Sequence, residues 1–180
     1  MIKKKALKIL KENPFELENL PNHFKKDKEI VLRVVKDNGA ALQYADKNFR
    51  KDKQIVLQAV KSNGFSIRFA DKKLKKDKKI TLEAVKSNGF ALQYIDKIFK
   101  KDRMVVLAAV KSQGAALQYA DKKFRKNKKF ILEALNQKGL VLEFADKKLK
   151  KDKKIVLAAV KQNGYHIKYA DKKFRKDKKI

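Results

Sequence analysis

The residue types that most often carry catalysis or bind metals are few and isolated in this chain. It contains two histidines, His23 and His166, and no cysteine. Neither histidine has a second one near it, whereas a zinc site needs several such ligands. The recurring aspartates have lysine neighbours, and none is paired with a second carboxylate at a spacing that suits acid–base catalysis. No glycine-rich phosphate loop or nucleophile motif is present. We therefore predict no catalytic, metal or cofactor site.

Positive charge is the strongest chemical signal, since the net charge is +29 at pH 7 and the pI is about 10.1. Runs such as KKLKKDKK around Asp77 and KKFRKNKK around Asn127 recur along the chain. If they stack along one edge, they could follow a phosphate backbone and gain affinity by releasing counterions. The alternative interpretation is a solvated surface whose lysines reflect A+T-rich coding. The candidate polyanion-binding residues are Lys72, Lys73, Lys75, Lys76, Lys122, Lys123, Arg125, Lys126, Lys147, Lys148, Lys150 and Lys151.

An aromatic residue recurs at a fixed interval, as Tyr44, Phe69, Tyr94, Tyr119, Phe144 and Tyr169. Repeat proteins that read RNA can recognise one base per repeat, and aromatic rings can stack on bases. Here tyrosine and phenylalanine interchange, so the hydroxyl group is dispensable. The neighbouring polar residue recurs as Gln43, Gln93 and Gln118, whereas base readers vary such residues. We therefore predict that the rings pack between repeats.

These residues are placed by a 25-residue repeat. Six copies begin at Asp27, Asp52, Asp77, Asp102, Asn127 and Asp152, and position 13 of each is Gly39, Gly64, Gly89, Gly114, Gly139 or Gly164. A fixed period of this size is typical of repeat solenoids. We expect 1–26 to be a degenerate N-terminal capping repeat, 27–176 to be six tandem repeats forming one solenoid, and 177–180 to start an incomplete further repeat.

The first half of each repeat is predicted to be a helix of about eleven residues, such as 53–63. Its first residue, usually Asp, is an expected N-cap. Apolar residues follow at positions 4, 5, 6, 8 and 9, and glycine at position 13 is expected to end the helix in the left-handed conformation. Position 6 is always leucine, which we expect to fill an interior slot. Alanine at position 8 should let neighbouring helices approach closely.

The second half of each repeat permits two interpretations. Apolar positions 16, 19 and 23, for example Ile67, Ala70 and Leu74, fit one face of an unbroken helix over positions 14–24. However, position 20 is aspartate in all six copies: Asp46, Asp71, Asp96, Asp121, Asp146 and Asp171. A second N-cap there would divide this half into a short helix and a further helical turn. We favour the division.

The pattern DKxIVLxAVKxNGxALQYADKxF resembles the repeat family known as domain of unknown function 4116. The resemblance covers nearly all of 27–176, and 1–26 more weakly. It implies the repeat fold and no particular activity. The family commonly has serine where this chain has aspartate at position 20, and its loops often carry acidic residues where this chain has lysine. The resemblance therefore does not make the basic charge a family function.

Together these patterns predict an all-α fold, a right-handed helical-repeat solenoid with a 25-residue period. Each repeat has one longer helix and a shorter helical segment. The predicted function is a non-enzymatic binding or scaffold module for a protein partner. The alternative is a sequence-nonspecific nucleic-acid binder that uses the stacked lysines. We expect no membrane insertion, because the apolar face is used for stacking.

Two further expectations concern the ends and the compartment. MIKKKALKILKENPF at the start has no apolar run of signal-peptide length, and no segment approaches the roughly 18 apolar residues of a membrane span. With the absence of cysteine, this predicts an intracellular protein. At the other end, Ala159, Val160 and Ile167 should be partly open. That would lead to self-association through the C-terminal end, fraying, or continuation in a longer natural chain.

Overall fold

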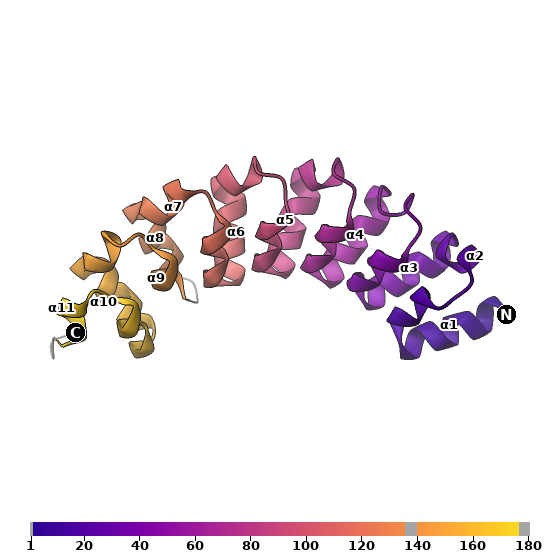
Figure 1. Ribbon diagram of the computed structural model, residues 1–180, viewed down its shortest axis with the longest axis horizontal. Coiled ribbons are helices and arrows are strands. Elements are labelled where there is room, and N and C mark those ends of the chain that lie inside the picture. Colours follow the sequence, from indigo (N-terminus) through magenta and orange to yellow (C-terminus); the bar gives the residue numbers. More distant parts are fainter. Residues whose placement is uncertain (1, 136–139, 177–180) are drawn as a thin grey trace.

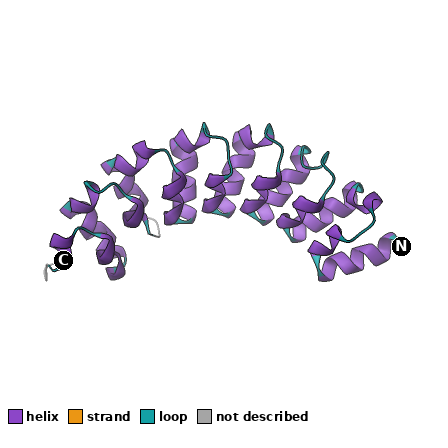
Figure 2. Ribbon diagram, in the orientation of Figure 1, coloured by secondary structure: helices purple, strands orange, loops and turns teal. Residues whose placement is uncertain are grey.

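In the computed structural model the chain forms a curved stack of short helical segments, with its two termini at opposite ends of the arc (Figure 1). The structure describes residues 2–135 and 140–176, and every regular element within them is helical (Figure 2). The longer helices are α1 (Lys3–Glu12), α3 (Lys28–Asp37), α4 (Lys53–Ser62), α5 (Lys78–Ser87), α6 (Arg103–Ser112), α8 (Lys128–Leu135) and α10 (Lys153–Gln162).

Two shorter segments complete a repeat. The first is mostly 3₁₀ helix: η1 (Pro14–Glu18), η2 (Gly39–Tyr44), η3 (Gly64–Phe69), η5 (Gly89–Gln93), η7 (Gly114–Tyr119), α9 (Val141–Phe144) and η9 (Gly164–Tyr169). The second is a single turn: α2 (Asn22–Lys25), η4 (Leu74–Lys76), η6 (Phe99–Lys101), α7 (Lys122–Lys126), η8 (Leu149–Lys151) and α11 (Lys172–Arg175). Residues 1–26 have the same order of elements as the later repeats. The predicted start of a further repeat at 177–180 lies outside the described residues, as does Gly139.

The longer helices begin as predicted, because the first aspartate of the repeat is an N-cap. In α4 the Asp52 carboxylate accepts hydrogen bonds from the backbone N–H groups of Gln54 (2.8 Å) and Ile55 (3.1 Å). Asn127 takes the same role in its repeat by accepting from Phe130 N–H at 2.9 Å. Each cap satisfies N–H groups that the first turn of a helix leaves without a partner.

The predicted left-handed glycine at the end of these helices is wrong. Gly39, Gly64, Gly89 and Gly164 have no φ angle in the left-handed region, and each starts a 3₁₀ helix. Space explains the first three. A Cβ atom on Gly89 would lie 2.3 Å from the carbonyl oxygen of Ala109, which is position 8 of the next repeat. Glycine here permits close approach of neighbouring backbones, and the preceding asparagine caps the 3₁₀ helix, as Asn88 does by accepting from Phe90 N–H.

The second half of the repeat is divided at position 20, as the recurring aspartate predicts. The Asp71 carboxylate accepts from Lys73 N–H at 2.9 Å, and the residue before it, Ala70, is extended. The same contact is made by the other five aspartates, Asp46, Asp96, Asp121, Asp146 and Asp171. The alternative of an unbroken helix over positions 14–24 is therefore wrong.

A continuous core runs along the stack and contains positions 4, 5, 8 and 9 of the longer helices, such as Ile55, Val56, Ala59 and Val60. Position 6 is different: its leucines are only half-buried, and Leu157 is 39% exposed. At about 100° per residue, position 6 lies about 130° from the centre of the stripe formed by the four buried positions. The expectation that leucine at position 6 fills an interior slot is therefore wrong.

Hydrogen bonds join neighbouring repeats at both edges of the arc. On the outer edge, the backbone N–H of position 20 donates to the carbonyl of position 24 in the preceding repeat, as Asp71 does to Arg50 (2.9 Å). On the inner edge, the N–H of Gly64 donates to Ser87 Oγ at 3.0 Å, and the equivalent bonds join Gly39 to Ser62 and Gly89 to Ser112. These bonds join each described repeat to its immediate neighbours, as in other repeat proteins.

The last described repeat is more open than the others. Val160 and Ile167 are half-buried, as predicted, and Tyr165 is 77% exposed. Ala159, by contrast, is fully buried, so the expectation of exposure there is wrong. The physical reason is that position 8 lies on the buried stripe of the helix, where Ala59, Ala84 and Ala109 are also fully buried. His166 is buried against the same helix, with its Nδ1 atom 3.1 Å from the carbonyl oxygen of Ala159.

Candidate binding surfaces

The single turns carry most of the predicted polyanion-binding residues and lie on the outer edge of the arc, where α2, α7 and α11 are visible in Figure 1. Nine of these residues have exposed side chains and are here called the cationic edge: Lys72, Lys73, Lys76, Lys122, Lys123, Lys126, Lys147, Lys148 and Lys151. Their placement at the turns that contain η4, α7 and η8 gives one side of the molecule a row of positive charge.

The other three candidates, at position 24, are half-buried rather than free. Lys75 donates to the carbonyl of Arg68 (2.7 Å), and Lys150 donates to that of Glu143 (2.6 Å). These cations cover carbonyls at the C-terminal end of the preceding 3₁₀ segment or short helix, where positive charge is favourable. Burial lowers the pKa of the Lys75 and Lys150 amines from the usual lysine value. Arg125 accepts the inter-repeat bond from Asp146 N–H through its carbonyl.

Carboxylates near this edge are already engaged in ion pairs between repeats. Lysine at position 2 pairs with the N-cap aspartate of the next repeat, as in Lys53–Asp77 (2.6 Å) and Lys78–Asp102 (2.8 Å). Hydrogen bonds from those lysines, aided by the capped backbone N–H groups, lower the pKa of the Asp77 and Asp102 carboxyls. The pairs Lys28–Asp52 and Lys128–Asp152 repeat the arrangement.

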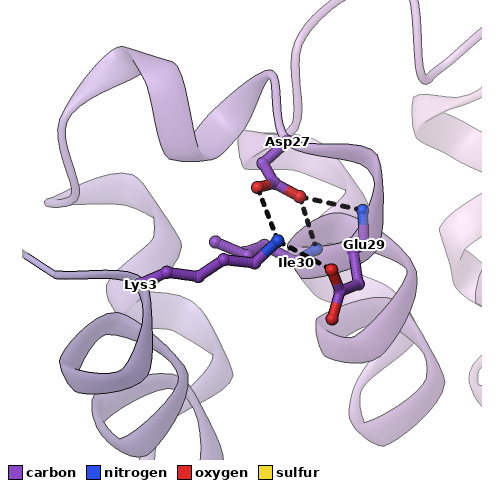
Figure 3. Close-up of polar contacts among 4 residues, drawn as sticks. All are labelled: Lys3, Asp27, Glu29 and Ile30. Atoms are coloured by element: carbon purple, nitrogen blue, oxygen red, sulfur yellow. Dashed lines mark hydrogen bonds and ion pairs between the residues drawn. The ribbon is translucent and has the colours of Figure 1, made fainter.

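At the N-terminal end the same position is occupied by Lys3. Figure 3 shows its amine between the Asp27 and Glu29 carboxylates, at 2.9 Å and 2.7 Å. Asp27 also accepts from the N–H groups of Glu29 and Ile30. Burial opposes ionisation of Asp27, but the hydrogen bond from Lys3 and the backbone bonds outweigh it and lower its pKa. Lys3 therefore attaches α1 to the first full repeat by the contact that joins the later ones.

A second surface, which the sequence reasoning missed, lies on the longer helices, on the side that faces away from their buried stripe. It is formed by the half-buried or exposed leucine at position 6, here called the Leu row: Leu7, Leu32, Leu57, Leu82, Leu107, Leu132 and Leu157. The signal was present in the sequence, because the angle of position 6 already places it outside the buried stripe. Exposed Met104 lies beside the row on α6 and helps to line a hollow with Leu107 and Ala108.

At its N-terminal end this surface includes a groove of about 600 Å³ over α1, α3 and α4, here called the N-terminal groove. Leu10 and Val34 are buried, while Leu7 and Leu32 are half-exposed; all four line it. Polar and charged residues complete the lining: Lys8, Lys11, Glu29, Arg33, Lys36, Asp37, Gln54 and Gln58. Its volume is within the range of ordinary ligand pockets. Its walls come from the longer helices of three consecutive repeats.

The recurring aromatic rings at position 18 are half-buried and pack against the core, in agreement with the prediction of packing between repeats. Tyr94 lies edge-on to Phe65 of the preceding repeat, with ring centroids 6.0 Å apart, and Tyr119 is similarly placed with Phe90. Such edge-to-face pairs stabilise beyond the area that they bury. The rings therefore have a clear structural role.

The next features considered in residues 2–135 and 140–176 are the two histidines, possible metal sites and possible membrane-spanning helices. His23 is exposed and contacts the ring of Phe24, whereas His166 is buried at the other end of the array. No cluster of three or more metal-ligating side chains occurs among these residues. Within the same part of the chain, no helix has both the length and the apolar character to cross a membrane.

The architecture defines a helical-repeat protein: each unit contributes one longer helix and two short segments to a shared core. Family assignment agrees with this class. The model of the Domain of unknown function (DUF4116) matches six overlapping stretches, 3–50, 27–75, 52–100, 77–125, 102–150 and 127–175. The chain belongs to this family, which confirms the resemblance found in the sequence. No curated protein and no solved structure matches the chain.

Proposed function

We propose that the array is a non-enzymatic binding or scaffold module for protein partners, and that its repeats wind in a right-handed sense. The observation that carries the functional proposal is the Leu row. The leucines recur at the same position of every longer helix and stay half-buried or exposed, although the core beside them is well packed. Apolar surface of this kind, bordered by polar residues, is typical of protein interaction sites.

The solenoid form supports the same proposal. Extended repeat arrays present long surfaces on which a partner can contact several repeats at once. Lysine at position 10, for example Lys86 and Lys111, is exposed beside Leu82 and Leu107. A partner would therefore meet apolar contacts bordered by positive charge, which gives both affinity and a preference for acidic partners.

Site-specific photo-crosslinking in cells tests this proposal. A photoreactive residue replacing Leu107 should crosslink to protein. The control is the same photoreactive residue replacing Lys122 on the cationic edge. Adding Leu82→Asp to the Leu107 probe should remove the protein crosslinks while the circular dichroism spectrum of the folded array is kept. Protein crosslinks that are equal at Leu107 and Lys122, or unaffected by Leu82→Asp, would contradict the assignment of the Leu row.

The cationic edge favours a second candidate, a nucleic-acid binder without base preference. Its exposed lysines follow one side of the arc, while nearby N-cap carboxylates are held by other lysines. Contacts of lysine with phosphates supply affinity and no sequence information. Crosslinks to nucleic acid from the Lys122 probe, in place of protein crosslinks from the Leu107 probe, would favour this candidate.

A further inference from the structure

The N-terminal groove combines an apolar floor with a rim that is positively charged once its ion pairs are counted. Both rim carboxylates are engaged: Glu29 pairs with Lys3 at 2.7 Å, and Asp37 pairs with Arg33 at 3.5 Å. The remaining rim cations, Lys8, Lys11 and Lys36, are exposed on α1 and α3. The rim is therefore cationic without a compensating anion from the groove itself.

The form of the groove matches an amphipathic helix better than a nucleic acid. Leu7 and Leu32 leave apolar surface open above the buried Leu10, and phosphate groups gain nothing from such surface. Helices commonly bind apolar grooves through side chains at i, i+4 and i+7 on one face. Acidic residues on the flanks of such a helix would lie near the lysines of the rim, which aids association and selects against basic helices.

We propose that the N-terminal groove binds an acidic amphipathic helix of a partner protein, with apolar side chains over Leu7 and Leu32 and carboxylates at Lys8, Lys11 and Lys36. This inference rests on the proposed protein-binding function and names the partner class and the place of contact. Charge alone would attract any acidic chain. The apolar floor is what should favour an amphipathic helix over other acidic chains.

Fluorescence anisotropy with a designed peptide tests the proposal on the full chain. The probe is a labelled peptide of about 18 residues, with leucine at i, i+4, i+7 and i+11 and glutamate at most other positions. A scrambled peptide of the same composition keeps the charge and loses the apolar face. At about 150 mM salt, where surface charges are screened beyond roughly 8 Å, we expect the amphipathic peptide to bind about tenfold more tightly or better.

Matched variants locate the binding. Leu32→Gln should remove the preference for the amphipathic peptide, whereas Leu82→Gln, at the same position of α5, should keep it. The double change Lys8→Glu with Lys36→Glu should weaken binding by about tenfold or more, whereas Lys122→Glu with Lys147→Glu, also exposed, should have a smaller effect. The lysine changes are on the surface and preserve the fold, so they remain informative if Leu32→Gln lowers stability.

Three results would overturn the inference. Equal binding of the amphipathic and scrambled peptides would show attraction by charge alone. Equal loss from Leu32→Gln and Leu82→Gln would place the contact along the whole Leu row, leaving the proposed function intact. Absence of peptide binding, with protein crosslinks still formed from the Leu107 probe, would remove the groove assignment alone; absence of those crosslinks as well would remove both.

Discussion

At the scale of single residues, the contact between position 13 and the next repeat governs how closely the units stack. A Cβ atom on Gly39 would lie 2.0 Å from the Ala59 carbonyl oxygen, a distance that requires the backbone to move. Gly164 has no atom within 4 Å of the same place, because it belongs to the more open last repeat. Two glycines at the same repeat position, each preceded by asparagine, thus have different structural constraints.

We expect Gly89→Ala to lower the free energy of unfolding by about 1–3 kcal/mol, the usual cost of overpacking. Gly164→Ala should leave it unchanged or raise it by up to about 1 kcal/mol, since alanine restricts the unfolded chain. Urea denaturation of the two variants and the parent checks both values. Equal losses in the two variants would mean that a local backbone requirement, and not inter-repeat contact, selects glycine.

The N-cap aspartates give stability a defined pH dependence. Hydrogen bonds from Lys53 and Lys78 lower the pKa of Asp77 and Asp102 in the folded state. Their contribution is therefore fully present above the unfolded pKa of about 3.9 and is lost as the pH falls through the lower folded value. We expect the urea midpoint to fall on acidification below about pH 4.

Asparagine at the same position separates the charge from the cap, since Asn127 keeps the hydrogen bond to the helix N-terminus. Asp77→Asn should reduce the slope of stability against pH in this acidic range and cost less at pH 7 than Asp77→Ala, which should cost about 1 kcal/mol. The reverse change, Asn127→Asp, should steepen the slope. A slope unaffected by both changes would locate the acid sensitivity in other carboxylates.

At the scale of elements, the lysine runs have two distinct roles that their sequence does not distinguish. Lys75 bonds to a carbonyl at the end of η3, whereas Lys72 on the same turn is exposed. We expect Lys75→Met to lower the free energy of unfolding by about 0.5–1.5 kcal/mol, the net value of one hydrogen bond. Lys72→Met should have little effect. Thermal melts of both variants, which carry the same change in charge, measure the difference.

Sequence reasoning succeeded where one physical cause explained a recurring residue. Aspartate at positions 1 and 20 has capping as its main local use, so both helix starts could be predicted. Glycine at position 13 has two common uses, a left-handed cap and close backbone approach, and only the neighbouring repeat distinguishes them. Because that neighbour is 20 residues further along, as Ala109 is from Gly89, the local sequence favoured the wrong one.

The candidate surfaces show the same limit. Exposed lysines such as Lys122 were predictable from the charge run, but the inward contact of Lys150 depends on where the carbonyl of Glu143 lies. The prediction that the Leu row is interior is wrong because a residue can be identical in every repeat without being buried. Leucine at position 6 is better explained by its angle on the helix, which leaves Leu32 and Leu82 between core and solvent.

At the scale of the whole molecule, salt dependence distinguishes an aligned cationic edge from scattered surface charge. If the edge follows phosphates, log K for duplex DNA should fall with log salt at a slope of about −0.9 per phosphate contacted. Replacing Lys72, Lys73 and Lys76 with Gln should then flatten the slope and weaken all sequences alike. Titrations at about 150 mM salt decide the matter: a Kd no tighter than about 10⁻⁴ M would leave the charge without a specific role.

The hydrogen bonds on the two edges of the arc also give the array an elastic response. Bending the arc more tightly would stretch the outer backbone bonds, such as Asp71 N–H to Arg50, while straightening it would stretch the inner bonds, such as Gly64 N–H to Ser87 Oγ. Deformation in either sense therefore lengthens one of the two sets of bonds, and the inner set joins the repeats between Gly39 and Ser112. We therefore expect the array to resist bending in both senses and to return to one curvature after a slight deformation.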